Sequence, residues 1–219
     1  CFNDYKKIIP KSIDWREKNA VTHVKNQGNC GSCWSFSTTG SIEGIHAIKK
    51  NKLINASEQQ LMDCSDQYGN HGCQGGLMDN AFKYVMDNGL CSEEDYPYQA
   101  EQGQCLSAQC NRVVQINNYS DVEPNNEKVL MRAVAQQPIS VAIQANLTSF
   151  RFYKNGIYQD PDCGDQLDHG VLIVGYGTDI LQDLDYWIVK NSWTSNWGDN
   201  GYIKILRNYE KFGGNSSGM

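Results

Sequence analysis

Residues 26–36 read NQGNCGSCWSF, and this stretch decides how the rest of the chain is interpreted. Cys30 and Cys33 stand three apart among glycines, and the residues after Cys33 predict a helix. A thiol at such a loop-to-helix junction faces unpaired backbone N–H groups and the positive end of the helix dipole. Both favour the thiolate, the form of cysteine that attacks. Cys33 is therefore a candidate nucleophile, and the Gln27 amide is a candidate donor to an oxyanion.

Composition limits the class of protein and its partners. The 219 residues, 40% hydrophobic and 11% aromatic, are enough to bury one large core or two small lobes. A net charge of −6 argues against a nucleic acid or an anionic membrane as partner. No apolar run approaches the ~20 residues of a membrane span. Nine cysteines indicate an oxidising compartment, and their odd number leaves at least one thiol free or paired outside the chain. Four N-x-[ST] sequons agree with secretion: Asn55, Asn118, Asn146 and Asn215.

Local patterns differ between the two halves of the chain. Helices are predicted at 34–50, 57–63, 78–88 and 127–136, with cysteine-held loops at 64–76 and 91–111. Strands are predicted at 139–144, 156–158, 169–176, 186–191 and 202–206. This order favours an α+β protein with two lobes and a cleft between them. We expect an N-terminal extension or pro-segment remnant over 1–8, a mainly helical lobe over 9–120 and a mainly β lobe over 121–219.

A cysteine nucleophile needs a base to share its proton, and the base needs a group that orients it. His46 lies on the same predicted helix as Cys33, roughly 20 Å away at ~1.5 Å per residue, which is too far. His169 opens the apolar strand HGVLIVGYG, and it alone among the four histidines is placed to face Cys33 across a cleft. Asn191 follows the strand YWIVK, and its amide oxygen can accept the imidazole N–H and leave the other ring nitrogen toward sulfur.

Several stretches together resemble the papain-like cysteine peptidases. They are QGNCGSCWSF, DHGVLIVGYG, and the turn NSW followed by WGDNGY, and they cover residues 9 to about 206. The family signature C-G-[SA]-C-[WY] has its His and Asn about 130–150 residues downstream. Here His169 and Asn191 lie 136 and 158 residues after Cys33, the second distance being slightly long. The stretch GCQGGLMDNAF is similar to the cathepsin L branch in particular.

The resemblance implies a role for each of these residues. Cys33 is the nucleophile, and His169 is the general base and then the acid. Asn191 orients His169, while Trp193 shields their hydrogen bond from water. The Gln27 side chain and the Cys33 backbone N–H form the oxyanion hole. The implied activity is that of an endopeptidase working through a thioester acyl-enzyme, without a metal or cofactor.

The resemblance also implies how a substrate is bound. Gly75 and Gly76 pair with extended substrate backbone, where a side chain would obstruct approach. Four small or apolar residues form the pocket for the second residue before the scissile bond (P2), namely Leu77, Met78, Ala142 and Gly170. We therefore expect a hydrophobic P2 side chain. Asp168 is interpreted as a turn residue next to the substrate that tunes His169.

Two disulfides are implied by the resemblance, and a third is our own inference from two extra cysteines in one loop. The expected pairs are Cys30–Cys73, Cys64–Cys105 and Cys91–Cys110. In the family, the cysteine at the position of Cys163 pairs just after a segment like GGNSSGM, where this sequence stops. We therefore expect a chain that lacks its final strand and the partner of Cys163. The alternative is a Cys1–Cys163 pair.

The sequence departs from the family pattern at His23, where proline is usual, and at Thr194, where glycine is usual. Neither residue touches the expected chemistry. The resemblance implies peptide and protein substrates, the protein's own pro-segment and cystatin-type inhibitors as partners. It also implies a monomer in the lysosome or vacuole, or outside the cell.

Other interpretations of these residues remain open at this point. Cys33 alone could be half of a disulfide, and Cys30 with Cys33 could form a redox pair, although such motifs follow a strand in a βαβ unit. Cys30 and Cys33 could also form half a zinc site with His71 and Cys73, although a second CxxC or an HxxxH is missing. At the level of function, the alternatives are a catalytically silent homologue that binds proteins, an exopeptidase of the same family and a peptide ligase.

Overall fold

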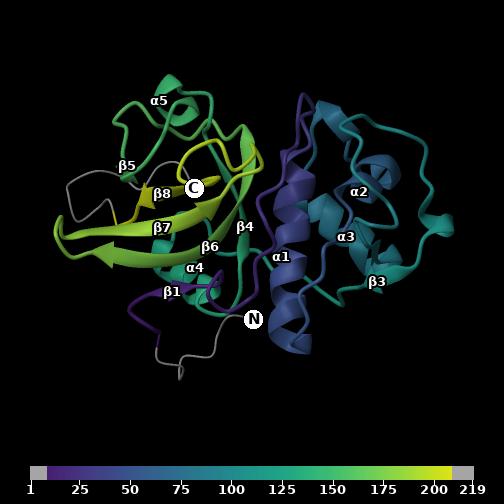
Figure 1. The fold of residues 1–219 in the computed structure, drawn as a ribbon, viewed down its shortest axis with the longest axis horizontal. Helices are drawn as coiled ribbons and strands as arrows, with labels where there is room; N and C mark the ends of the chain where they lie inside the picture. The colour runs from purple at the N-terminus through teal and green to yellow at the C-terminus, as the bar shows by residue number, and fades with distance from the viewer. Residues whose placement is uncertain (1–8, 209–219) are drawn as a thin grey trace.

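The computed structural model of the chain describes residues 9–208. The expected N-terminal extension, Cys1, Asn215 and the end of the chain lie outside these residues. The helix α1 (Cys33–Lys50) stands in the middle of the molecule, with a β-sheet on one side and α2, α3 and the cysteine-held loops on the other (Figure 1). The expected α+β, two-lobe architecture is therefore confirmed. Within residues 9–208, no helix is long and apolar enough to cross a membrane.

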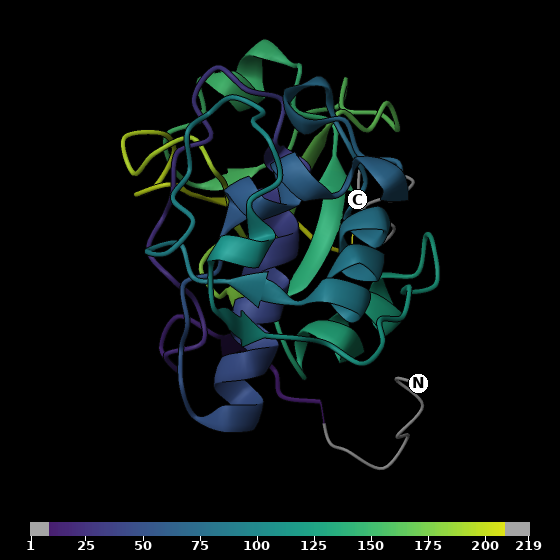
Figure 2. The same ribbon diagram turned by 90° about the vertical axis from the view of Figure 1, so that its right-hand side faces the viewer.

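Among the described residues, the helical lobe contains three α-helices and short connecting elements, and in Figure 2 α2 and α3 lie nearer the viewer than α1. Its elements after α1 are α2 (Glu58–Cys64), η1 (Asp66–Tyr68), η2 (Gly72–Gln74), α3 (Met78–Asn88), β2 (Leu90–Cys91), η3 (Ser107–Gln109) and β3 (Arg112–Val114). The three helices lie within one residue of their predicted bounds. Ser57 caps α2 by accepting a hydrogen bond from the Gln60 backbone N–H at 3.0 Å. The Gln60 side chain does not complete a capping box, because its oxygen accepts from the Cys91 N–H instead.

Up to Asn208, where the described part of the chain ends, the β lobe is one six-stranded sheet with two helices packed beside it. Its elements are β1 (Ile13–Asp14), α4 (Glu127–Val134), β4 (Ile139–Ile143), α5 (Thr148–Arg151), β5 (Ile157–Tyr158), β6 (His169–Asp179), β7 (Leu184–Lys190) and β8 (Tyr202–Leu206). The strand order is β1-β6-β7-β8-β5, and β4 also pairs with β6. A core that includes Phe150, Tyr176 and Trp187 fills the space between the sheet and α4. The long strand β6 thus carries His169 at its start and borders three other strands.

The strand β1 lies within the range expected for the helical lobe, 9–120, yet it pairs with the sheet of the β lobe. Ile13 of β1 pairs with Tyr176 of β6, and the Trp15 indole donates to the Val134 carbonyl at 2.7 Å. The sequence missed β1, β2, β3 and α5. Each has only two to four residues, too few for a repeating pattern of apolar side chains.

Close packing between α1 and β6 brings the two lobes together. A Cβ at Gly40 would lie 2.7 Å from the Leu172 side chain, so a larger residue here would require the buried Leu172 to shift. The Ser37 hydroxyl donates to the Val171 carbonyl at 2.7 Å, and the Ser140 hydroxyl donates to the Ser37 carbonyl at 2.8 Å. These contacts fix the N-terminus of α1 against the start of β6.

Disulfides tie the helical lobe, and their pairing matches the expectation. The bonds are Cys30–Cys73, Cys64–Cys105 and Cys91–Cys110. Within residues 9–208, Cys33 and Cys163 have no disulfide partner. Because Cys30 is bonded to Cys73, Cys33 is neither a disulfide half nor part of a Cys30–Cys33 redox pair. Neither expected partner of Cys163 is among the described residues, so its pairing stays a prediction.

Candidate active site

Cys33 is the first residue of α1, so its thiol lies at the helix N-terminus, as expected. The backbone N–H of Gly170 donates to its sulfur at 3.3 Å. Burial raises the pKa of the Cys33 thiol, and the backbone N–H groups of Gly170 and Trp34 offset only part of that rise. The helix terminus alone therefore does not produce a thiolate here, contrary to the simplest interpretation of the junction. The sulfur needs a partner that takes its proton.

His169 is the first residue of β6, directly before the Gly170 that contacts the sulfur, and only 6% of it is exposed. Its Nε2 lies 2.8 Å from Asn191 Oδ1. The Ser192 backbone N–H donates to the same Oδ1 at 2.8 Å, which identifies this atom as the amide oxygen. Nε2 therefore carries a hydrogen, and Nδ1 is left to exchange a proton. Burial lowers the pKa of His169, while Asn191 and, more weakly, Asp168 act to raise it.

Aromatic rings cover the His169–Asn191 pair. The Trp193 ring centre lies 4.8 Å from that of His169, at an interplanar angle of 31°. Phe150 and Trp197 meet the Trp193 ring edge to face and hold it in place. A hydrogen bond kept away from water in this way is electrostatically stronger than an exposed one.

Gln27 is buried beside the nucleophile and is held by several hydrogen bonds. Its Nε2 donates to the Cys30 carbonyl at 2.9 Å, and its Oε1 accepts from the Ser192 hydroxyl at 2.6 Å. The Gln27 backbone N–H donates to the Ser192 carbonyl at 2.9 Å. Since an amide nitrogen has two hydrogens, one remains for a substrate oxygen. The sequence had not singled out Ser192, and its position next to Asn191 was the available signal.

Asp168 lies in an exposed turn before β6, and its Oδ1 accepts from the Ala145 backbone N–H at 2.7 Å. It acts on His169 through its charge. Among residues 9–208, no three His, Cys, Asp or Glu side chains gather in a way that could hold a metal ion. Cys73 lies in its disulfide, so the zinc half-site with His71 is wrong.

The two glycines expected to meet the substrate backbone are needed for different reasons. Gly75 has a φ of +110°, and a Cβ there would meet no atom within 4 Å. Its backbone conformation, which side chains disfavour, therefore explains the glycine. A Cβ at Gly76 would lie 2.8 Å from the Trp34 ring and 2.6 Å from Asn70 Oδ1, so packing explains this one. Because Gly76 has no side chain, the backbone there can lie close to Trp34, the residue after Cys33.

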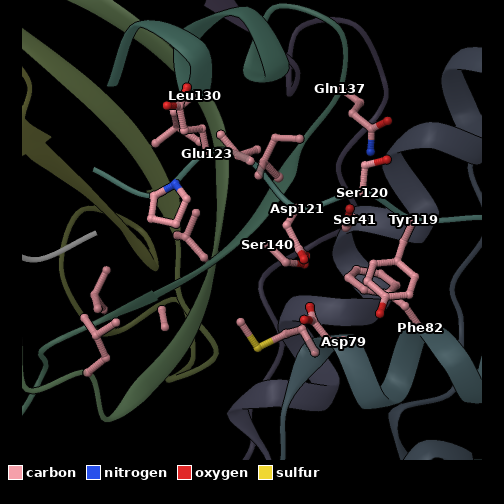
Figure 3. Close-up of a pocket in the computed structure, with 18 of the residues that line it drawn as sticks. Ser41, Asp79, Phe82, Tyr119, Ser120, Asp121, Glu123, Leu130, Gln137 and Ser140 are labelled. Carbon is pink, nitrogen blue, oxygen red and sulfur yellow. The ribbon is translucent and has the colours of Figure 1, made fainter. Parts of the chain in front are cut away.

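The residues expected to form the P2 pocket lie together. Ala142 of β4 pairs with Gly170 of β6, and a Cβ at Gly170 would lie 3.3 Å from the Met78 sulfur. Leu77, the residue before Met78, is 63% exposed. Met78 and Ala142 also line a cavity of about 1150 Å³ between the lobes (Figure 3).

The large cavity is not uniformly apolar. Figure 3 shows the carboxylates of Asp79 and Asp121 inside it, near Ser41 and Ser140. Burial, together with the charge of Asp121, raises the pKa of Asp79. The apolar P2 walls therefore continue into a region of negative charge, which the sequence did not indicate.

A cysteine at a helix N-terminus, a His–Asn pair at the facing strand end and a neighbouring amide donor define a cysteine-protease type of site. The family model described as "Papain family cysteine protease" matches residues 9–219, and the chain belongs to that family. The chain is 53% identical over 205 residues to Cathepsin L1 of Drosophila melanogaster, covering 92% of this chain and 55% of that protein. It is 51% identical over 217 residues to Cysteine proteinase EP-B 1 of Hordeum vulgare, covering 96% of this chain and 56% of that protein.

Solved structures agree with this assignment. Digestive procathepsin L 3 of Tenebrio molitor superposes with a TM-score of 0.89 at 46% identity, covering 99% of this chain and 71% of that one. Bromelain of Ananas comosus in complex with the E64 inhibitor gives a TM-score of 0.87 at 44% identity, covering 91% of each chain. The chain spans little more than half the length of both curated relatives. The cathepsin L-like, papain-type fold expected from the sequence is thereby confirmed.

Proposed function

We propose that the protein is a cysteine endopeptidase. One observation carries the proposal, namely that His169 Nε2 is bonded to Asn191 Oδ1 at 2.8 Å while the next residue, Gly170, donates its backbone N–H to the Cys33 sulfur at 3.3 Å. This bond fixes the tautomer, so that Nδ1 is free to take the thiol proton. The Cys33 thiolate and the His169 imidazolium stabilise each other by opposite charge. This attraction opposes burial, which raises the pKa of Cys33 and lowers that of His169. Proton transfer from Cys33 to His169 then gives a thiolate–imidazolium pair.

The reaction follows from this proton transfer. The Cys33 sulfur attacks the peptide carbonyl carbon, and the carbonyl oxygen becomes an oxyanion that accepts from Gln27 Nε2 and the Cys33 backbone N–H. His169 Nδ1–H then protonates the leaving amine as the C–N bond breaks, which leaves a thioester on Cys33. Water gives a proton to Nδ1 and attacks the thioester, and the proton returns to sulfur as the acid leaves. Asn191 keeps the imidazole ring in place throughout.

Substrate recognition is part of the proposal. The backbone of Gly75 and Gly76 binds extended substrate, and Met78, Ala142 and Gly170 surround a hydrophobic P2 side chain. An acidic P2 residue is disfavoured in addition by the carboxylates of Asp79 and Asp121 in the adjoining cavity.

The proposal extends to partners and compartment. A digestive procathepsin L was solved as a related chain, and we propose that this protein too is made with a pro-segment that covers the cleft. Cystatin-type proteins are proposed inhibitors of the monomer. Three disulfides favour an oxidising compartment, which fits the lysosome, the vacuole or the outside of the cell.

The test is cleavage of an internally quenched peptide library with both ends blocked. We expect cleavage with a hydrophobic residue at P2, complete inhibition by one equivalent of E-64, and no activity in Cys33→Ala. Reaction of E-64 with Cys163 in place of Cys33, or peptidase activity that survives Cys33→Ala, would contradict the proposal. Binding of peptides without turnover would favour the silent homologue, and cleavage only of peptides with a free end would favour an exopeptidase. Transfer of the acyl group to an added amine in preference to water would favour a ligase.

A further inference from the structure

The Gln27 backbone is held from both lobes. Ser192 of the β lobe bonds its N–H and its side-chain oxygen. From the helical lobe, the Tyr98 hydroxyl donates to the Gln27 carbonyl at 2.8 Å. The intervening loop to Cys33 contains Gly28 and Gly31, and Gly28 has a φ of +62°. The loop is also tied through Cys30, whose carbonyl accepts from Gln27 Nε2 and whose sulfur is bonded to Cys73, so Tyr98 adds to these bonds a contact that joins Gln27 to the helical lobe directly.

The same Tyr98 hydroxyl lies 2.6 Å from the Ser32 hydroxyl. A carbonyl oxygen only accepts, so Tyr98 uses its one hydrogen on Gln27, and Ser32 must donate to Tyr98. Ser32 is the N-cap residue of α1 and is fully buried, but its side chain makes no capping hydrogen bond. Its hydroxyl therefore belongs to a chain of two hydrogen bonds that runs from the residue before Cys33, through Tyr98, to Gln27.

Tyr98 is itself well fixed. Its backbone N–H donates to Glu93 Oε1 at 2.8 Å. Its ring meets Phe36 of α1 edge to face, with 4.9 Å between ring centres. Burial raises the pKa of Tyr98, so the hydroxyl stays protonated and keeps its donor across the neutral range. A ring held at both ends can act as a rigid spacer between the Gln27 loop and α1.

We propose that Tyr98 is a positioning residue for the oxyanion hole, which sets the spacing between the Gln27 amide and the Cys33 backbone N–H. This inference rests on the proposed peptidase function. The two donors must both lie about 2.7–3.1 Å from one developing oxyanion, so a shift of a few tenths of an ångström weakens one of them. The negative charge on this oxygen develops only in the transition state, so the loss falls on kcat and leaves KM nearly unchanged.

The test is Tyr98→Phe, which keeps the ring and its contact with Phe36 and removes only the hydroxyl. We expect kcat for a peptidyl amide to fall about fivefold to tenfold, with KM within twofold. Affinity for a peptide aldehyde, whose adduct with Cys33 places an oxygen in the hole, should fall by the same factor. Alkylation of Cys33 by iodoacetamide creates no oxyanion, so its rate should stay within twofold.

A double-mutant cycle separates positioning from general loosening of the structure. Gln27→Ala should lower kcat by roughly 10²–10³. Adding Tyr98→Phe to Gln27→Ala should then change kcat by less than twofold, because no amide is left to misplace. Tyr96→Phe is the matched control. It removes a hydroxyl from the same segment, one that donates to Asp63 at 2.8 Å, and should leave kcat within twofold.

Three results would overturn the inference. The first is an unchanged kcat in Tyr98→Phe. The second is that Tyr98→Phe lowers kcat by the same factor in the Gln27→Ala background as in wild type. The third is that Tyr98→Phe lowers the rate of Cys33 alkylation by the same factor as kcat. If Tyr98→Phe fails to fold, Ser32→Ala decides the question, with an expected twofold to threefold loss of kcat that vanishes in the same background. An inactive wild-type protein, or alkylation away from Cys33, would instead count against the proposed function itself.

Discussion

Lys25 is the cation of a buried cluster that ties the segment carrying Gln27 to two helices of the helical lobe. Its Nζ lies 3.0 Å from Glu43 of α1 and 2.6 Å from Glu58 of α2, and each carboxylate side chain is 1% exposed. Burial lowers the pKa of Lys25, but the two carboxylates outweigh this effect and raise it. One charged lysine therefore serves two buried carboxylates, and its removal leaves both with hydrogen bonds from Thr22, Thr39 and the Ala56 N–H but without the cation that contacts them.

We predict that Lys25→Met destabilises the protein by about 3–5 kcal/mol, the usual cost of breaking a buried ion pair from one side. The buried Lys190, whose pKa burial lowers to about 8, limits this loss. The neighbouring charge of Lys25 also lowers that pKa, so Lys190 holds its proton more firmly in the variant and faces the carboxylates as a cation. For a chain of this size the melting temperature should fall by roughly 6–20 °C.

The pH dependence of this loss has a definite sign. A buried carboxylate without its cation destabilises the fold when it is ionised and much less when it is neutral. The stability of the variant therefore falls as pH rises. The difference from wild type should be larger at about pH 7 than at about pH 4.

The assay is urea and thermal unfolding at both pH values, with Lys18→Met as the matched control. Lys18 is exposed, so its replacement should change stability by no more than about 0.5 kcal/mol. Adding Glu43→Gln and Glu58→Gln to Lys25→Met should restore most of the loss, because no carboxylate is left buried without its cation and Lys190, no longer facing two carboxylates, gives up its proton more readily. A Lys25→Met melting temperature within about 2 °C of the control would refute the reasoning, as would a triple variant less stable than Lys25→Met alone.

Three further predictions concern the site and its surroundings. Asn191→Ala removes the hydrogen bond that raises the pKa of His169. We therefore expect kcat to fall at least about tenfold and the alkaline limb of the pH–rate profile to move to lower pH. An alkaline limb that does not move would count against this role of Asn191. Thr194 has a φ of +66°, a backbone conformation that strains a β-branched residue. Thr194→Gly should therefore raise the free energy of unfolding by about 0.5–1 kcal/mol. A lower melting temperature in the variant would contradict this. Burial and the charge of Glu58 raise the pKa of Glu93 from 4.5 to about 7, so the folded state holds this proton more tightly and stability falls as pH rises through that window. After allowance for solvent screening, Glu93→Gln should be more stable than wild type by about 1–2 kcal/mol at about pH 8, and equally stable below about pH 4. Urea unfolding at the two pH values measures this difference. Equal stability of the variant and wild type at both pH values would refute the prediction.

Short-range patterns in the sequence were sufficient for the longer helices and strands and for the reacting residues. α3 begins at Met78 and ends before Gly89 as predicted, because apolar spacing and a glycine stop act within a few residues of each other. Cys33, His169 and Asn191 could be named because each stands at the end of a recognisable helix or strand. The long strands of the sheet were found for the same reason.

The tertiary structure decided what surrounds these residues. The Ser192–Gln27 contact spans 165 residues and the Tyr98–Gln27 contact spans 71, so no local pattern connects their ends. The state of the nucleophile was decided in the same way. The sequence placed the Cys33 thiol at a helix N-terminus, which favours a thiolate, but burial between the lobes raises its pKa. Desolvation depends on every segment packed around an atom, so only the assembled fold shows that Cys33 must rely on His169 for its proton transfer.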